Sequence, residues 1–172
     1  MRHRILGVCA LLALTFTTSE RVTAQGDGNV ATVSFGIGLN TPPTSAQNHH
    51  VLPQTVRIKQ GGVVNFAVAG FHQIYIYDPG VTKDDIIVPG GMPPPLFINY
   101  ENDVFYRGLV PAGGPPNTAA TTNPSNASNR MEPVAFLEPG TYLVICNVRP
   151  HFLNGMYAYV VVTKGNDPNS NQ

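Results

Sequence analysis

The 172-residue sequence predicts an all-β domain built as a two-sheet sandwich. Charged residues make up only 12% of the chain, while 17 glycines and 16 prolines provide many turn positions. Short runs of β-branched and aromatic residues recur between these turns, and no convincing amphipathic helix pattern appears. Several short strands separated by Gly and Pro turns are typical of a sandwich, in which each sheet buries one face against the other.

The first 24 residues have the three-part pattern of a secretory signal peptide. A basic start, Met1–Arg4, precedes the uncharged apolar run Ile5–Phe16, which is too short to span a bilayer, and Val22–Ala24 offers small residues to a signal peptidase. Cys9 lies inside the apolar run, which argues against a lipid-modified cysteine. No later segment is long and apolar enough to be a membrane span. We therefore expect a single exported domain, periplasmic or secreted, over residues 25–172.

Charge and cysteine content narrow the class of protein. After removal of the signal, seven basic and nine acidic residues remain, a net charge of about −2 with histidine neutral. This balance argues against nucleic acid or an anionic membrane surface as the partner. Cys146 is then the single cysteine of the mature chain, although exported proteins usually pair their thiols. It is either a buried small hydrophobic residue or a functional thiol.

Strands are predicted in order along the chain from short apolar runs and from the alternation of apolar with polar residues. Turns at Gly61-Gly62, Pro79-Gly80 and Pro139-Gly140 separate several of them. The predicted strands are Asn29–Leu39, Pro53–Lys59, Val63–Ala69, His72–Asp78, Val134–Leu137, Thr141–Cys146 and Met156–Lys164, with weaker signals at Ile86–Val88 and Leu96–Leu109.

Residues 111–130 differ in composition from the rest of the chain. They are almost free of large apolar groups, so they cannot bury enough surface to offset the entropy of ordering. We expect a long flexible loop insertion here, which is either a tolerated insertion or a docking element. Residues 165–172 are expected to form a polar C-terminal tail.

Three residues with metal-binding side chains lie around one connection near the C-terminus. Side chains alternate between the two faces of a strand, so Cys146 shares a face with Val144, and Met156 shares a face with Ala158. His151 lies between them, so the connection can present sulfur, nitrogen and sulfur toward one point. His72, at the start of a predicted strand, adds a fourth donor. The adjacent pair His49-His50 is expected to be a solvated part of a loop.

The donor types favour copper. Two histidines, one cysteine and a weak axial methionine are the ligands of a blue-copper electron-transfer site. Zinc accepts cysteine and histidine but has little use for methionine. A dinuclear copper site would need a second cysteine in this loop, and a copper oxidase would need histidines beside the cysteine, where Ile145 and Asn147 stand instead.

The stretch P-G-T-Y-L-V-I-C-N-V-R-P-H-F-L-N-G-M-Y-A-Y-V-V-V, residues 139–162, resembles the cupredoxins, the small type 1 blue copper proteins. A weaker resemblance lies in P-Q-T-V-R-I-K-Q-G-G-V-V-N-F, residues 53–66. The resemblance to this family covers roughly residues 30–164, apart from the loop around 111–130, and implies a Greek-key β-sandwich. It also implies one type 1 copper per chain, held by His72, Cys146, His151 and Met156. Many members carry Asn or Ser after the first histidine, where it helps to hydrogen-bond the cysteine sulfur, whereas this chain has Gln73.

The resemblance implies a monomeric carrier of single electrons between Cu(I) and Cu(II), and not an enzyme. Redox partner proteins are expected to dock near His151, where Pro150, Phe152 and Leu153 would form an apolar patch if exposed. The alternatives are a copper carrier or resistance protein and a cupredoxin-like interaction module without copper. An enzyme with Cys146 as nucleophile and His151 as base is disfavoured, because no motif supplies an oxyanion hole.

Overall fold

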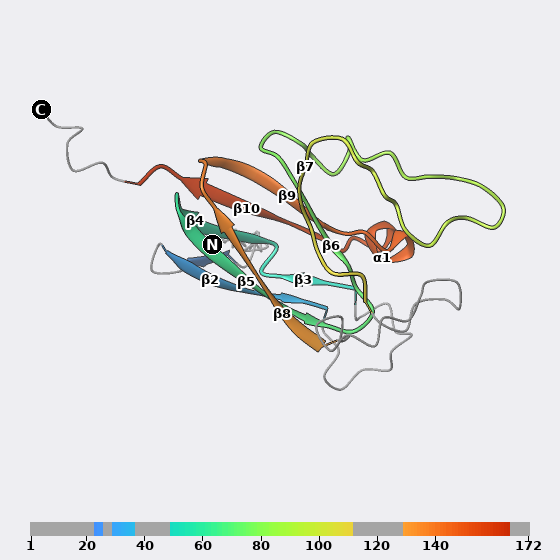
Figure 1. The fold of residues 1–172 in the computed structure, drawn as a ribbon, viewed down its shortest axis with the longest axis horizontal. Helices are drawn as coiled ribbons and strands as arrows, with labels where there is room; N and C mark the ends of the chain where they lie inside the picture. The colour runs from blue at the N-terminus through green and yellow to red at the C-terminus, as the bar shows by residue number, and fades with distance from the viewer. Residues whose placement is uncertain (1–22, 26–28, 37–48, 112–128, 166–172) are drawn as a thin grey trace, which may run out of the picture.

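The computed structural model describes residues 23–25, 29–36, 49–111 and 129–165 (Figure 1). Within these ranges the chain forms short strands and one five-residue helix. In chain order the elements are β1 Thr23–Gln25, β2 Val30–Phe35, β3 Val51–Leu52, β4 Thr55–Lys59, β5 Gly62–Ala69, β6 Ile74–Tyr77, β7 Val104–Arg107, β8 Asn129–Phe136, β9 Gly140–Cys146, α1 Arg149–Leu153 and β10 Tyr157–Thr163.

The strands form two sheets packed face to face. One sheet has the order β1-β4-β10-β9-β6-β7 and the other has the order β3-β2-β5-β8. The chain crosses several times between the sheets, so that β4 pairs in parallel with β10, and β2 pairs in parallel with β5. The predicted all-β Greek-key sandwich is confirmed.

Alternating side chains build the core between the two sheets. Strand β5 alternates buried and half-buried residues along its whole length, and β2 alternates buried with exposed ones. The predicted inward faces of β9 and β10 are confirmed, since both belong to the main core. The members from these two strands and the residue before β10 are Tyr142, Val144, Cys146, Met156, Ala158, Val160 and Val162.

Strands β6 and β9 are buried on both faces, because a long loop covers the outer side of their sheet. All four residues of β6 are buried, and Leu143 and Ile145 of β9 point away from the main core into a second cluster. Ile86 and Ile98, from the segment between β6 and β7, complete that cluster together with the two tyrosines of β6. In Figure 1 this green-to-yellow segment runs beside α1 at one end of the sandwich.

Several predicted boundaries differ from the structure. His72 precedes β6 instead of starting it, and Ile86–Val88 is irregular instead of a strand, because Ile86 is buried as part of a covering loop. Asn129 and Arg130, assigned from composition to the flexible loop, belong to β8, where pairing with β5 orders them. The helix α1 and strand β3 were not predicted.

Other predictions lie outside the described residues: the signal peptide apart from Thr23 and Ala24, most of the loop insertion, and the C-terminal tail from residue 166. Strand β1 spans the predicted cleavage junction and pairs with β4. In the described part of the chain, no helix has the length and apolar character needed to cross a bilayer.

Candidate metal centre

Three of the four predicted ligands converge at the end of the sandwich that carries α1. Cys146 is the last residue of β9, and His151 lies in α1, five residues further along. Strand β6 pairs with β9 so that Ile74 is opposite Cys146, which brings His72, two residues earlier, to the same end. The positions therefore follow from strand pairing between segments 74 residues apart.

The three donor atoms lie close enough to share one metal ion. The Sγ atom of Cys146 is 3.6 Å from His72 Nδ1 and 3.7 Å from His151 Nδ1, and the two Nδ1 atoms are 3.0 Å apart. Donors bound at about 2.0–2.3 Å from one metal lie roughly 3–4 Å from one another. One thiol and two imidazoles at these separations fit a copper or zinc ion.

The ring of His72 is held with its Nδ1 facing the other donors. The ring also hydrogen-bonds to the backbone carbonyl of Ala69. Gly36 leaves the space for this arrangement, because a Cβ there would lie 2.5 Å from the Ala69 carbonyl oxygen and 2.6 Å from His72 Nε2. A proton held at Nε2 leaves the lone pair on Nδ1, as a metal ligand requires.

Two backbone N–H groups point at the sulfur of Cys146. They belong to Gln73 and Val148, the residues that follow His72 and Asn147 in the chain, and both lower the pKa of the thiol. Gln73 therefore supplies a backbone donor to the sulfur, while its side chain bonds to Gly108 and Asn147. Hydrogen bonds to the sulfur of a metal-bound cysteine are one way in which a protein adjusts the potential of the metal.

The side chain of Gln73 is part of a buried clamp that was not predicted from the sequence, because its members are far apart in the chain. Its Nε2 donates to the carbonyl of Gly108 at 3.0 Å, and its Oε1 accepts from Asn147 Nδ2 at 2.9 Å. The same Nδ2 also donates to Asn99 Oδ1, and Asn147 Oδ1 accepts from the backbone N–H of Asn99. Asn147 is fully buried, so these bonds fix the chain beside Cys146.

Burial keeps the three donors neutral in the metal-free protein. It lowers the pKa of His72 to about 3, with the neighbouring His151 adding to the effect, and lowers that of His151 to about 4. It raises the pKa of the Cys146 thiol to about 12. Both imidazoles are therefore ready to bind a metal at neutral pH, whereas the thiol must lose its proton when the metal enters.

Met156 is fully buried in the same core cluster as Cys146. Its backbone N–H donates to the carbonyl of His151 at 3.1 Å, and its carbonyl accepts from the N–H of Cys146 at 3.0 Å. The residue therefore closes the loop that carries the other two predicted ligands of this segment. A role for its thioether as an axial ligand stays a prediction.

The expectation that His49 and His50 form a solvated pair is wrong for His49. The ring of His49 is buried and stacks on that of His151, with centroids 3.7 Å apart and planes at 24°. Asn154 Nδ2 donates to its Nδ1 at 2.8 Å. His50 is exposed, as expected. Strand β3 begins at Val51 and pairs with β2, and this pairing brings His49 to the site. No local pattern in the sequence predicts that pairing.

Comparison with solved structures returned similar proteins of low sequence identity. The chain is similar to reduced auracyanin from Roseiflexus castenholzii, at 16% identity and a TM-score of 0.45, over 80% of this chain and 99% of that one. For rusticyanin from Thiobacillus ferrooxidans the values are 18% and 0.42, over 82% of each chain. For a purple cupredoxin from Nitrosopumilus maritimus they are 12% and 0.41, over 77% and 99%. No family model and no curated protein sequence matches the chain.

Proposed function

We propose that this protein is an exported type 1 copper protein of the cupredoxin family, and that it carries single electrons between redox partners. The observation that carries the proposal is the buried meeting of His72 Nδ1, His151 Nδ1 and Cys146 Sγ within 3.7 Å of one another. A buried methionine beside this cysteine makes copper a better fit than zinc.

The four side chains have different roles in the proposed centre. The Cys146 thiolate would be the strong ligand, the two neutral imidazoles would add nitrogen donors, and the Met156 thioether would bind weakly. Copper would supply a Cu(I)/Cu(II) couple that takes up and gives back one electron. The chain supplies rigidity: the Gln73 and Asn147 clamp and the His72–Ala69 bond hold the ligands, so that little rearrangement accompanies electron transfer.

The partner surface is proposed to lie around His151, which is partly exposed where Cys146 is fully buried. Pro150 and Leu153 on either side of it are exposed, whereas Phe152 is half-buried and packs against the second apolar cluster. An electron would leave through the imidazole edge, because His151 joins the buried donors to this apolar surface. We propose that the protein works as a monomer with transient protein partners.

The competing functions make different use of the same side chains. An enzyme with Cys146 as nucleophile is disfavoured, since burial raises the pKa of the thiol to about 12 and leaves it inaccessible. A copper carrier would release its metal readily to an acceptor, whereas the buried donors and the clamp favour retention. An interaction module without copper would have no need for the convergent donor set.

Copper loading of residues 25–172 tests the proposal. We expect one copper per chain by elemental analysis and, in the oxidised form, an intense visible band from the Cys146 thiolate. The band should vanish on reduction and return on oxidation without loss of metal. Stoichiometric copper without the band would contradict the proposed type of site. Loss of copper from the protein during a cycle of reduction and oxidation would favour a copper carrier.

Export is tested on the protein that cells release. We propose cleavage before Gln25, which would remove Thr23 and Ala24 from β1 and leave the pairing of β4 with β10 intact. N-terminal sequencing of the exported protein checks this site. An intact Met1 on the exported protein would contradict the proposed signal peptide.

A further inference from the structure

A buried ion pair lies next to the candidate metal centre, and neither of its members is a proposed ligand. It joins Arg130 to Glu132, whose side chains are 5% and 3% exposed and whose charged atoms are 2.6 Å apart. Both belong to β8, and the period of the strand puts them on the same inward face as Val134 and Phe136. A charged pair therefore occupies two positions that would otherwise extend the apolar core.

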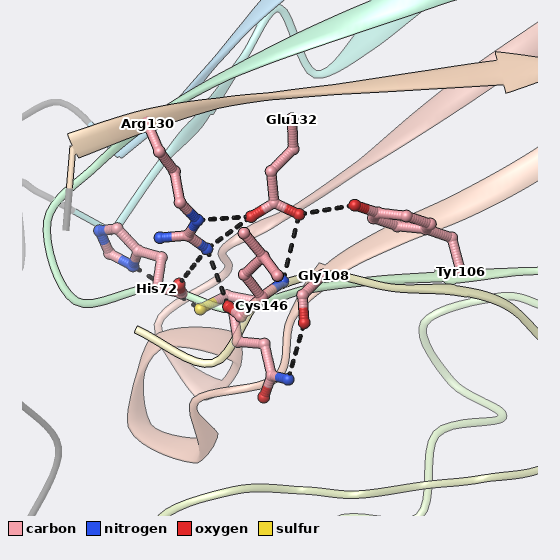
Figure 2. Close-up of polar contacts among 8 residues, drawn as sticks. His72, Tyr106, Gly108, Arg130, Glu132 and Cys146 are labelled. Carbon is pink, nitrogen blue, oxygen red and sulfur yellow. Dashed lines mark hydrogen bonds and ion pairs between the residues drawn. The ribbon is translucent and has the colours of Figure 1, made fainter. Parts of the chain in front are cut away.

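The guanidinium of Arg130 holds the backbone of the first ligand. Its Nη2 donates to the carbonyl of His72 and to that of Leu109, both at 3.0 Å, while its Nε donates to Glu132. Figure 2 shows the guanidinium on the same side of the pair as His72 and the Cys146 sulfur, with Tyr106 on the opposite side. The positive member of the pair is thus the one that faces the centre.

Glu132 is fixed in turn from the opposite side. Its Oε2 accepts the hydroxyl of Tyr106 at 2.8 Å and the backbone N–H of Leu109 at 3.3 Å. Gly108 leaves room for this carboxylate, since a Cβ there would lie 2.6 Å from Oε2. Among the described residues, no buried side-chain nitrogen or oxygen lacks a hydrogen-bond partner. The pair is a built, fully bonded arrangement.

Stability alone does not explain this pair. Removing two charges from water costs free energy that their attraction often fails to repay, and apolar residues of similar size are frequently as stable. The two charges of the pair also lie at different positions relative to the candidate metal centre. Its positive member donates to the carbonyl of His72, whereas its negative member is bonded to the hydroxyl of Tyr106 on the opposite side.

We propose that Arg130, held by Glu132, is a positioning residue that fixes the backbone of His72 and raises the reduction potential of copper bound at the centre. This inference rests on the proposed copper function. Reduction lowers the charge of the centre by one unit, and a nearby buried cation favours the reduced form. The fork of hydrogen bonds also restrains His72, so the ligand keeps its place in both oxidation states.

The test replaces both charges with neutral amides of similar shape, Arg130→Gln with Glu132→Gln, so that no unpaired charge is buried. The matched control is Arg107→Gln with Glu101→Gln, an ion pair whose side chains are 53% and 51% exposed. Potentiometric titration should show a lower reduction potential for the Arg130/Glu132 variant and an unchanged one for the control. Competition with a Cu(I) chelator should show copper affinity reduced by about 10- to 100-fold in the former alone.

A second variant, Arg130→Lys, separates the two effects and remains informative if the double variant fails to fold. Lysine keeps the charge but cannot bond both carbonyls and the carboxylate as the planar fork does. We expect a reduction potential near that of the wild type with weaker copper binding. Equal potential and equal affinity in all variants would overturn the proposal. A wild-type protein without the visible copper band would instead overturn the proposed function, and it is measured first.

Discussion

At the scale of single residues, the proposed ligands contribute unequally. Cys146 is fully buried, and its sulfur receives backbone hydrogen bonds from Gln73 and Val148. Met156 is held in place by backbone hydrogen bonds to His151 and Cys146. A thiolate is a strong ligand and a source of the visible band, but an axial thioether binds weakly. The two sulfur atoms can therefore be distinguished by substitution.

We predict that Cys146→Ser abolishes the visible band, while Met156→Leu keeps the band and shifts the reduction potential. Leucine matches methionine closely enough in volume that the buried site should still pack. Visible absorption and potentiometric titration of the two copper-loaded variants check the prediction. If Met156→Leu lost copper as completely as Cys146→Ser, the methionine would not be an axial ligand.

His72 and His49 are both buried histidines beside His151, yet their contacts differ. His72 directs Nδ1 at the cysteine sulfur, whereas His49 stacks on the ring of His151 and accepts a hydrogen bond from Asn154. We predict that His72→Ala loses the visible band and most of the stabilisation by copper. His49→Ala should keep the band but lose copper faster to a chelator, because one face of the His151 ring is uncovered.

The exposed neighbour His50 provides the control for this pair of variants. His50→Ala should match the wild type in band, melting temperature and copper loss. Loss of the band in His49→Ala together with its survival in His72→Ala would mean that the first ligand is wrongly assigned.

At the scale of elements, the end of β2 shapes the site although it carries no ligand. Gly36 follows β2 with φ +90°, a backbone conformation that favours glycine, and packs against the His72 ring. Gly61, with φ +82°, has the same backbone requirement, but a Cβ added there would meet nothing within 4 Å. The two glycines therefore separate backbone strain from the loss of space.

We predict that Gly36→Ala weakens copper binding and lowers the melting temperature more than Gly61→Ala does. Both substitutions strain the backbone, at a cost of about 1–2 kcal/mol, but only the first pushes the His72 ring from its place. Thermal unfolding of the metal-free Gly61→Ala variant measures the cost of backbone strain alone, and the additional loss in Gly36→Ala, together with chelator competition, measures the part specific to Gly36. Equal copper affinities would show that the ring tolerates the added methyl group.

At the scale of the whole molecule, the buried donors link stability to pH. The histidine pKa is 6.5 ordinarily but about 3 for His72 and about 4 for His151 in the fold. Below pH 6.5 the unfolded chain therefore binds more protons than the folded one. For Cys146 the pKa rises from 9.0 to about 12, so above pH 9 the folded chain keeps a proton that the unfolded chain loses.

We predict that the metal-free protein loses stability in both directions from a plateau between pH 6.5 and 9. The histidine contribution falls away as the pH drops from 6.5 toward 3, and the cysteine contribution falls away as it rises from 9 toward 12. Urea unfolding at a series of pH values measures the free energy. His72→Ala should reduce the loss of unfolding free energy below pH 6.5, and Cys146→Ser should reduce the loss above pH 9. If the wild type lost stability in neither direction, burial would not hold these groups neutral.

Features that depend on local periodicity were predictable from the sequence. The alternation in β9 and β10 placed Cys146 and Met156 on the core side, and the short connection between those strands placed His151 near them. The predicted turns at Gly61-Gly62 and Pro139-Gly140 lie where β4 gives way to β5 and β8 to β9. These inferences succeed because two-residue periodicity and turn chemistry act over a few residues.

Only the tertiary structure decided how distant segments complete the site. The bond from Asn154 to His49 joins residues 105 positions apart, and that from Arg130 to the His72 carbonyl joins residues 58 apart. Arg130 lies at the edge of a polar stretch, so composition assigned it to a loop. Pairing of β8 with β5 turned Arg130 inward, and pairing of β3 with β2 brought His49 to the site. Burial depends on what the folded chain brings opposite a residue and not on its neighbours in sequence.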